Sequence, residues 1–204
     1  TFYNAYVYHV YGLTEASPRV AYLPPAYFGA LPESVGIPLP SVQVKIIDAA
    51  GKTVPHGVEG ELCIKGKNVM MGYYRDPELT AQVLGADGWL RTGDIASMNE
   101  SGFIKIKCRK DHMIIRAGMN IYPQEIENML LSDKRTYEVL AYAIPDAMSG
   151  QKIGIKIVGN YRNKNEVLQL CRELLPPYAV PSVIEIVDEL LKNASGKVIR
   201  NGKT

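Results

Sequence analysis

The chain has 204 residues, of which 47% are hydrophobic and 22% are charged, a composition typical of globular domains. Its 23 basic and 21 acidic residues leave a net charge of +2, which excludes the strongly basic surface of most nucleic-acid-binding domains. No run of residues approaches the roughly 20 apolar residues of a membrane span. Because residue 1 is threonine rather than methionine, we expect a fragment of a longer protein.

Three cysteines are widely spaced, odd in number and without a C-x-x-C pair. Neither a zinc site nor a disulfide framework is expected from this pattern. We therefore expect a reducing, cytoplasmic setting.

Residues 2–10 are rich in aromatic and β-branched side chains and end in the segment Y-G-L-T-E, residues 11–15. This pattern predicts a strand that delivers a loop. Loops at the carboxyl ends of strands are common ligand sites, and here a phenol, a hydroxyl and a carboxylate arrive together. A strand-ending turn without a ligand is the plainer interpretation of a pentapeptide considered alone.

A proline-rich stretch, residues 16–39, is expected to be mostly loop. Strands are predicted at residues 42–46 and 61–65, and their close spacing favours an antiparallel barrel or sheet. Asp76 and Pro77 fit the N-cap and the first position of a short helix. We interpret this part of the chain as scaffolding.

Residues 89–118 are expected to join two domains. The segment T-G-D, residues 92–94, is predicted to end a strand, and residues 104–108 alternate in the pattern of a strand with one wet face. Four polar residues, 109–112, then separate this strand from a second apolar run at 113–115. Such a break could be a hinge, and an ordinary β-hairpin is the simpler alternative.

Helices and strands alternate in the second half of the chain, which predicts a small α/β domain of about 90 residues. The predicted elements are a helix from Pro123, strands at 137–144 and 152–158, a helix at 164–175 and a strand at 183–187. The tail contains Lys197, and most lysines in such polar ends are simply solvated.

Several of these segments resemble motifs of the adenylate-forming superfamily, which comprises acyl-CoA synthetases, luciferases and peptide-synthetase adenylation domains. The matching segments are Y-G-L-T-E (11–15), T-G-D (92–94), R-K-D (109–111), G-M-N-I-Y-P-Q-E-I-E (118–127) and G-K-V-I-R (196–200). The resemblance implies an α+β fold. Residues 1–110 would be the end of the large AMP-binding domain, with a distorted β-barrel subdomain, and residues 111–204 a mobile small C-terminal α/β domain.

The resemblance also implies roles for individual residues. The nucleotide-binding residues would be Tyr11, Gly12, Thr14, Asp94 and Arg109, with Tyr11 packing on adenine, Thr14 contacting the α-phosphate and Asp94 holding the ribose hydroxyls. Glu15 would bind magnesium, Asp111 would be the hinge, and Gly118 would line a channel for the pantetheine arm of CoA. Lys197 would be the catalytic lysine that bridges the substrate carboxylate and the α-phosphate.

The match departs from the family pattern at Cys108, His112 and Leu191, where glycine, aspartate and proline are usual. None of these departures removes a charged group to which the resemblance assigns a role. The family's Ser/Thr/Gly-rich phosphate loop, which precedes Y-G-x-T-E, has no counterpart in this chain. We therefore expect the chain to need a missing N-terminal part and to be inactive alone.

These patterns favour a fragment of an acyl-CoA synthetase that uses a carboxylic acid, Mg-ATP and CoA. The N-I-Y-P-x-E-I-E form of residues 120–127 is the form typical of CoA ligases. A narrow channel for the thiol would leave no room for a Cβ at Gly118. The alternative is that Gly118 merely ends a strand. Two alternatives stay open, namely an adenylation domain that loads a carrier protein and a non-catalytic module that binds a nucleotide or a partner.

Overall fold

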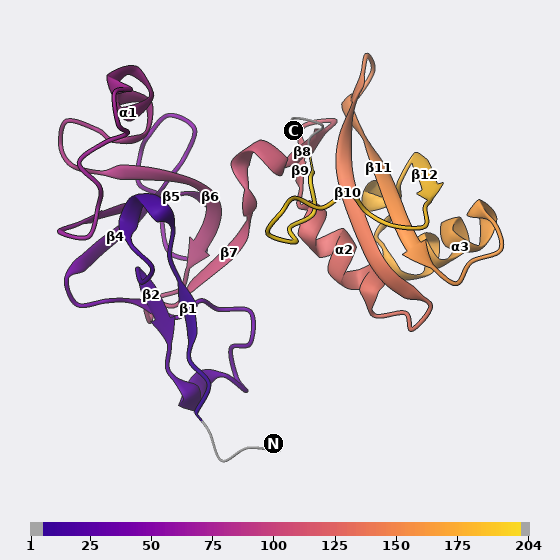
Figure 1. Cartoon of the computed structure of the whole chain (residues 1–204), viewed down its shortest axis with the longest axis horizontal. Coiled ribbons are helices and arrows are strands. Elements are labelled where there is room, and N and C mark those ends of the chain that lie inside the picture. Colours follow the sequence, from indigo (N-terminus) through magenta and orange to yellow (C-terminus); the bar gives the residue numbers. More distant parts are fainter. Residues whose placement is uncertain (1–5, 201–204) are drawn as a thin grey trace. The chain divides into compact units, whose positions relative to one another are not determined.

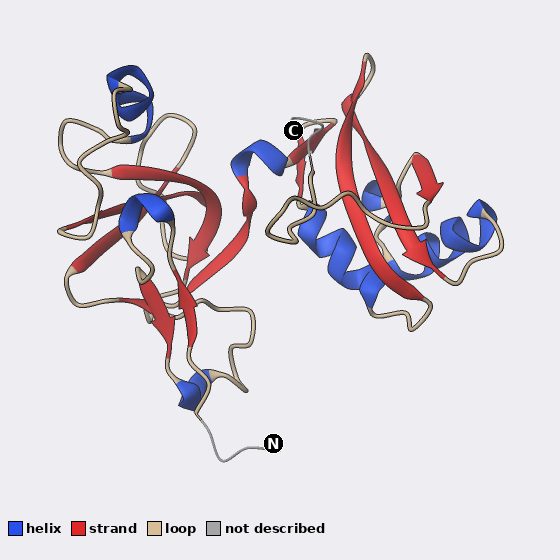
Figure 2. Ribbon diagram, in the orientation of Figure 1, coloured by secondary structure: helices blue, strands red, loops and turns tan. Residues whose placement is uncertain are grey.

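The computed structural model describes residues 6–200, and the chain forms two compact units that divide between Lys110 and Asp111 (Figure 1). The first unit, residues 1–110, is mainly β, and the second, residues 111–204, combines strands and helices (Figure 2). The predicted α+β class is confirmed. Whether the second unit is mobile stays a prediction.

The first unit is built from two antiparallel sheets. One has the order β1 (His9–Tyr11), β2 (Ala21–Leu23), β3 (Ile37–Pro38), and the other the order β4 (Val42–Ile47), β5 (Gly60–Gly66), β6 (Leu90–Met98), β7 (Ile104–Arg109). Two 3-10 turns, η1 (Thr14–Ala16) and η2 (Pro25–Tyr27), lie in the connections. Of the strand predicted at residues 2–10, the described part begins at His9, and residues 1–5 lie outside the described residues.

The four-stranded sheet of the first unit is open. Its core side chains Leu62, Ile64 and Ile104 are fully buried. Closure into a barrel would require β4 to pair with β7, but residues 35–36 occupy the edge at the start of β7 through the Gly36–Ile104 bridge. The expected distorted barrel is therefore wrong for the described residues 6–110.

Helix α1 (Pro77–Val83) forms where its sequence signals place it. The side chain of Asp76 accepts a hydrogen bond from the backbone N–H of Leu79 at 2.9 Å, and Pro77 fills the first turn, where no backbone donor is needed. The predicted helix start is confirmed.

The polar break after β7 is a 3-10 turn, η3 (Lys110–His112). β7 pairs with β6, whereas β8 (Ile114–Arg116) pairs with β9 (Met119–Ile121) and belongs to a different sheet. The β-hairpin alternative for residues 104–115 is therefore wrong. The hinge role of Asp111 stays a prediction.

In the second unit, five strands form one sheet of order β10-β11-β8-β9, with β12 added parallel to β11. The remaining elements are α2 (Pro123–Leu131), β10 (Thr136–Asp146), β11 (Gly150–Gly159), α3 (Lys164–Leu174), η4 (Pro177–Ala179) and β12 (Val183–Ile186). These confirm the helices and strands expected there.

Every second residue of β11 points into the core of the second unit. Ile153, Ile155 and Ile157 are fully buried, and they pack with Leu130 of α2 and Leu170 of α3. Both helices therefore cover the same face of the sheet. None of the described helices has the length and apolar character needed to cross a membrane.

None of the three cysteines, all of which are described, forms a disulfide. Cys63 and Cys171 are buried, and Cys108 is partly exposed. Burial raises the pKa of the Cys63 and Cys171 thiols to about 11 in each case.

Candidate active site

A polar pocket of about 280 Å³ lies in the first unit, between the loop that follows β1, the first half of β6 and the end of β7. Glu15, Tyr73, Gly93 and Arg109 are among its lining residues. It brings together residues that are up to 97 positions apart in the sequence, from Leu13 to Lys110. Because the pocket is lined by carboxylate, phenol and guanidinium groups, it suits a polar ligand.

Tyr11 and Asp94 form the tightest contact next to this pocket. The phenol O–H of Tyr11 donates to Oδ2 of Asp94 at 2.5 Å, and Asp94 is only 8% exposed. Burial and the neighbouring Asp94 carboxylate raise the pKa of Tyr11 above its usual range, so the phenol stays a donor at neutral pH. Asp94 is thus held as a buried, oriented carboxylate.

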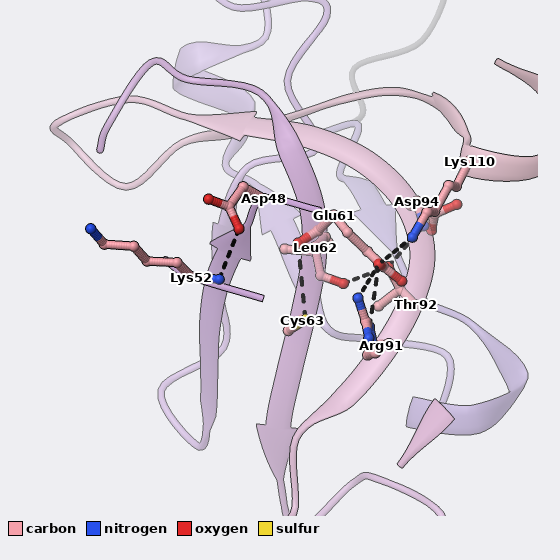
Figure 3. A network of polar contacts seen from close by, with 9 residues as sticks. All are labelled: Asp48, Lys52, Glu61, Leu62, Cys63, Arg91, Thr92, Asp94 and Lys110. Carbon is pink, nitrogen blue, oxygen red and sulfur yellow. Dashed lines mark hydrogen bonds and ion pairs between the residues drawn. The ribbon is translucent and has the colours of Figure 1, made fainter. Parts of the chain in front are cut away.

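The T-G-D segment owes its shape to Thr92 and Gly93. Thr92 Oγ1 donates to the carbonyl of Leu62 at 2.8 Å and accepts from the backbone N–H of Asp94 at 3.0 Å (Figure 3). The prediction that this segment ends a strand is wrong, because it lies inside β6. Gly93 has φ +71°, which interrupts the strand geometry and favours glycine.

Arg109 lies opposite Asp94 in the β6–β7 register. One guanidinium nitrogen donates to the carbonyl of Thr92 at 2.9 Å and lies 3.6 Å from Oδ1 of Asp94. A Cβ on Gly93 would lie 3.1 Å from the guanidinium, so this glycine gives Arg109 its room. The structure therefore brings Tyr11, Asp94 and Arg109 together.

Gly12 and Thr14 belong to the loop between β1 and β2. A Cβ on Gly12 would lie 2.4 Å from the carbonyl carbon and oxygen of Pro18, so only glycine fits where the chain folds back. Thr14 begins η1 and is exposed. Their assignment to nucleotide binding stays a prediction.

Glu15 has a partner that the sequence analysis did not identify. The phenol O–H of Tyr73 donates to Oε1 of Glu15 at 2.7 Å, and this hydrogen bond is the largest cause of the raised pKa of Tyr73. Mg²⁺ in phosphate-binding sites is held by one or two protein carboxylates together with phosphate oxygens. A single oriented carboxylate on a polar pocket fits that donor set.

Glu61 is the centre of a second network that sequence reasoning missed. Its Oε2 accepts hydrogen bonds from Arg91 Nη2 at 3.1 Å and from Lys110 Nζ at 3.0 Å, and its side chain is 8% exposed (Figure 3). Burial alone would raise the pKa of Glu61, but Lys110 and Arg91 outweigh it and the pKa is lowered. No local sequence signal predicts this network, because Arg91 and Lys110 lie 30 and 49 positions from Glu61 in the sequence.

Lys197 lies in the second unit, in a turn of residues 193–197 that we call the lysine turn. It is exposed, and its backbone N–H donates to Oδ1 of Asn193 at 2.9 Å. The approach of Lys197 to the pocket of the first unit stays a prediction, as does the catalytic role assigned to it.

Gly118 lies in the turn between β8 and β9. It has φ +79°, its neighbour Ala117 has φ +49°, and no atom lies within 4 Å of a Cβ built on it. Within the described residues, the backbone conformation of the turn explains this glycine, and steric crowding does not. A CoA channel at Gly118 stays a prediction.

Comparison with known proteins places both parts of the chain. The family model described as AMP-binding enzyme matches residues 1–74, and the model described as AMP-binding enzyme C-terminal domain matches residues 125–197. A long-chain-fatty-acid–CoA ligase of Escherichia coli O6:H1 is 40% identical over 197 residues, which cover 96% of this chain and 35% of the relative. A 2-succinylbenzoate–CoA ligase of Bacillus cytotoxicus is 35% identical and is covered to 40%.

A solved structure gives the same result for the fold. The o-succinylbenzoate CoA synthetase of Bacillus subtilis, in complex with its acyl-adenylate intermediate, has a TM-score of 0.88 and 31% identity over 96% of this chain and 40% of that chain. The chain therefore spans about 35% to 40% of the length of these relatives.

Proposed function

Because the chain belongs to the AMP-binding enzyme family, in its acyl-CoA synthetase branch, we propose that it is part of an AMP-forming acid–thiol ligase. In the first half-reaction, a carboxylate oxygen of the acid attacks the α-phosphorus of ATP, and pyrophosphate leaves. In the second, the thiol of CoA attacks the acyl carbonyl, AMP leaves and the thiol proton passes to solvent.

The arrangement of Tyr11, Asp94 and Arg109 is the observation that carries this proposal. Asp94 is a buried carboxylate that can accept hydrogen bonds from two ribose hydroxyls, and the O–H of Tyr11 keeps it oriented. The guanidinium of Arg109, half exposed beside it, supplies donors for the nucleotide. Together they fit the ribose end of ATP.

Glu15 and Tyr73 supply the place for magnesium. Bound Mg²⁺ would neutralise charge on the phosphates while pyrophosphate leaves. Tyr73 orients the carboxylate of Glu15 toward this task through the 2.7 Å hydrogen bond. The phosphate loop itself would come from a further N-terminal part of the same protein.

Lys197 and Asp111 would allow one protein to catalyse the two half-reactions in turn. The ammonium of Lys197 is a mobile point charge that can stabilise negative charge on the attacking carboxylate and the α-phosphate. Rotation about Asp111 would then withdraw it and bring Gly118 to the thiol channel. Cysteines that form no disulfide suit a reducing cytoplasm, which we propose as the setting.

The proposal is tested by Lys197→Ala in the full-length ligase. Losing the charge should slow carboxylate-dependent exchange of pyrophosphate into ATP by about 10² to 10³, a typical loss for removal of one transition-state donor. Thiolysis of supplied acyl adenylate by CoA should change much less. Lys192→Ala is the matched control, because Lys192 borders the same turn but pairs with Glu138 at 2.8 Å.

Equal losses in both half-reactions would show that Lys197 is not specific to adenylation. Transfer to a carrier protein but not to free CoA, in the unmutated ligase, would move the protein to the carrier-loading branch.

A further inference from the structure

The lysine turn is a tightly bonded unit organised by Asn193. Its side-chain Oδ1 accepts from the N–H of Ser195 at 3.1 Å, from Ser195 Oγ at 2.8 Å and from the N–H of Lys197 at 2.9 Å. The N–H of Asn193 donates to the carbonyl of Lys197 at 2.9 Å, and Gly196 takes φ +78°. Both backbone polar groups of Lys197 are thus bonded to one residue, so these hydrogen bonds hold the two ends of the turn together.

Ion pairs attach this turn to the second unit on both sides. Before the turn, Lys192 Nζ lies 2.8 Å from Glu138 Oε1, with side chains 42% and 34% exposed. After the turn, Arg200 donates to Glu127 twice, at 2.6 Å and 2.7 Å, with side chains 22% and 4% exposed. Only the second pair is bidentate and largely withdrawn from water, so it is the stronger attachment.

Glu127 also belongs to the framework of the second unit. It lies on α2, and its Oε1 accepts the backbone N–H of Ala141 in β10 at 2.9 Å. One carboxylate therefore connects a helix, a strand and the tail. A buried ion pair contributes little net stability compared with an apolar pair of the same size, so its presence here calls for a positional reason.

We propose that Glu127 and Arg200 are positioning residues, which fix the lysine turn to the second unit so that Lys197 is presented from a rigid base. Arg200 follows Lys197 by three residues, a reach of about 10 Å of extended chain, so a fixed guanidinium confines the turn closely. The fork of arginine suits this task better than lysine, because two parallel hydrogen bonds fix direction as well as distance. The role of the fixed turn in adenylation rests on the function proposed above.

Two variants weaken the pair differently. Arg200→Lys keeps the positive charge and loses the bidentate geometry. Glu127→Gln loses the negative charge and keeps an oxygen that can accept the N–H of Ala141. Glu138→Gln is the matched control, because it breaks the exposed pair on the other side of the same turn.

Hydrogen exchange of backbone amides in the 204-residue chain measures the attachment without any activity. In both variants the amides of Lys197 and Ile199 should exchange about tenfold faster, equivalent to about 1.4 kcal/mol, while those of Ile155 and Ile157 in the core keep their rates. The Glu138→Gln change should alter exchange by less than about twofold. Unchanged exchange in Arg200→Lys would overturn the proposal, and faster exchange throughout the second unit would show a general loss of stability instead.

The same variants in the full-length ligase separate this proposal from the proposed function. Arg200→Lys should slow adenylation about tenfold and leave thiolysis nearly unchanged. If Lys197→Ala blocks adenylation while Arg200→Lys leaves it intact, the proposed function stands and the positioning role is refuted. If Lys197→Ala slows both half-reactions equally, the adenylation-specific role of Lys197 fails, and the exchange result alone decides whether the pair holds the turn.

Discussion

Replacing Glu61 with glutamine should destabilise the first unit measurably. The substitution keeps the shape and an acceptor oxygen but removes the charge on which Arg91 and Lys110 converge. Glutamine thus leaves the sheet intact and removes only the ionic part of the network.

The magnitude follows from the exposure of the three side chains. Glu61 is 8% exposed, whereas Arg91 and Lys110 are 42% and 52% exposed. A hydrogen bond to a charged group contributes about 1.5–3 kcal/mol and an exposed ion pair about 0.2–1 kcal/mol, so each of these half-exposed contacts should contribute about 1 kcal/mol. Losing both should lower the free energy of unfolding by about 2 kcal/mol and, with a slope of about 2 kcal/mol per molar urea, the midpoint by about 1 M.

The single tryptophan of the chain, Trp89, makes the first unit separately observable. It directly precedes β6, and the ammonium of Lys45 lies 4.3 Å from its ring centroid. Urea unfolding followed by tryptophan fluorescence therefore reports the first unit. Glu33→Gln is the control, because Glu33 forms an exposed ion pair with Lys105 in the same unit and should contribute less than about 0.5 kcal/mol.

The stabilisation by the Glu61 carboxylate should depend on pH in a defined direction. The pKa of Glu61 is lower in the folded state than its unfolded value of about 4.3, so its stabilisation is fully present above that value and is lost as the pH falls through the folded pKa. The difference in unfolding free energy between Glu61→Gln and the unmutated chain should be complete at pH 7 and should shrink as the pH falls below the unfolded pKa and through the lower folded pKa of Glu61. A difference in unfolding free energy below about 0.5 kcal/mol at pH 7, or one that persists in acid, would refute the reasoning.

Two further substitutions test the site in the full-length ligase. Tyr73→Phe should raise the magnesium concentration needed for half-maximal pyrophosphate exchange by about fivefold, because Glu15 loses its hydrogen-bond donor. Tyr74→Phe is the control, because the ring of Tyr74 is exposed, and it should not change this concentration. An unchanged magnesium requirement in Tyr73→Phe would remove Tyr73 from the site. Gly118→Leu should leave acyl-adenylate formation nearly unchanged and slow transfer to CoA at least about tenfold. Gly51→Leu is the control, because Gly51 has a similar φ of +81° and equally open surroundings, and it should slow neither half-reaction. Equal effects at the two glycines would mean that backbone strain, and no channel, is responsible.

Local signals in the sequence were enough to place most elements. The Asp76 cap and Pro77 define the start of α1, and the apolar periodicity of residues 164–175 predicts α3 to within one residue. These features depend on residues within one or two turns of each other. They can therefore be read without knowing the rest of the fold.

Features that depend on distant residues could not be predicted in this way. The sheet is open because residues 35–36 pair with the edge of β7, and no sequence feature near β7 predicts that contact. The partners of Glu15 and Glu127 lie 58 and 73 positions away. The motif resemblance predicted nucleotide-binding roles for Asp94 and Arg109, and only the structure shows which side chains contact these two residues.

The burial of two cysteines has a practical consequence for chemical labelling. The pKa of about 11 for Cys63 and Cys171 leaves only a very small thiolate fraction at neutral pH, and the surrounding core blocks reagents. Cys108 is partly exposed and directly precedes Arg109. A mild alkylating dye would therefore attach selectively at Cys108. It would give a fluorescent reporter one residue from Arg109, the arginine that we propose binds the nucleotide, without any engineered cysteine.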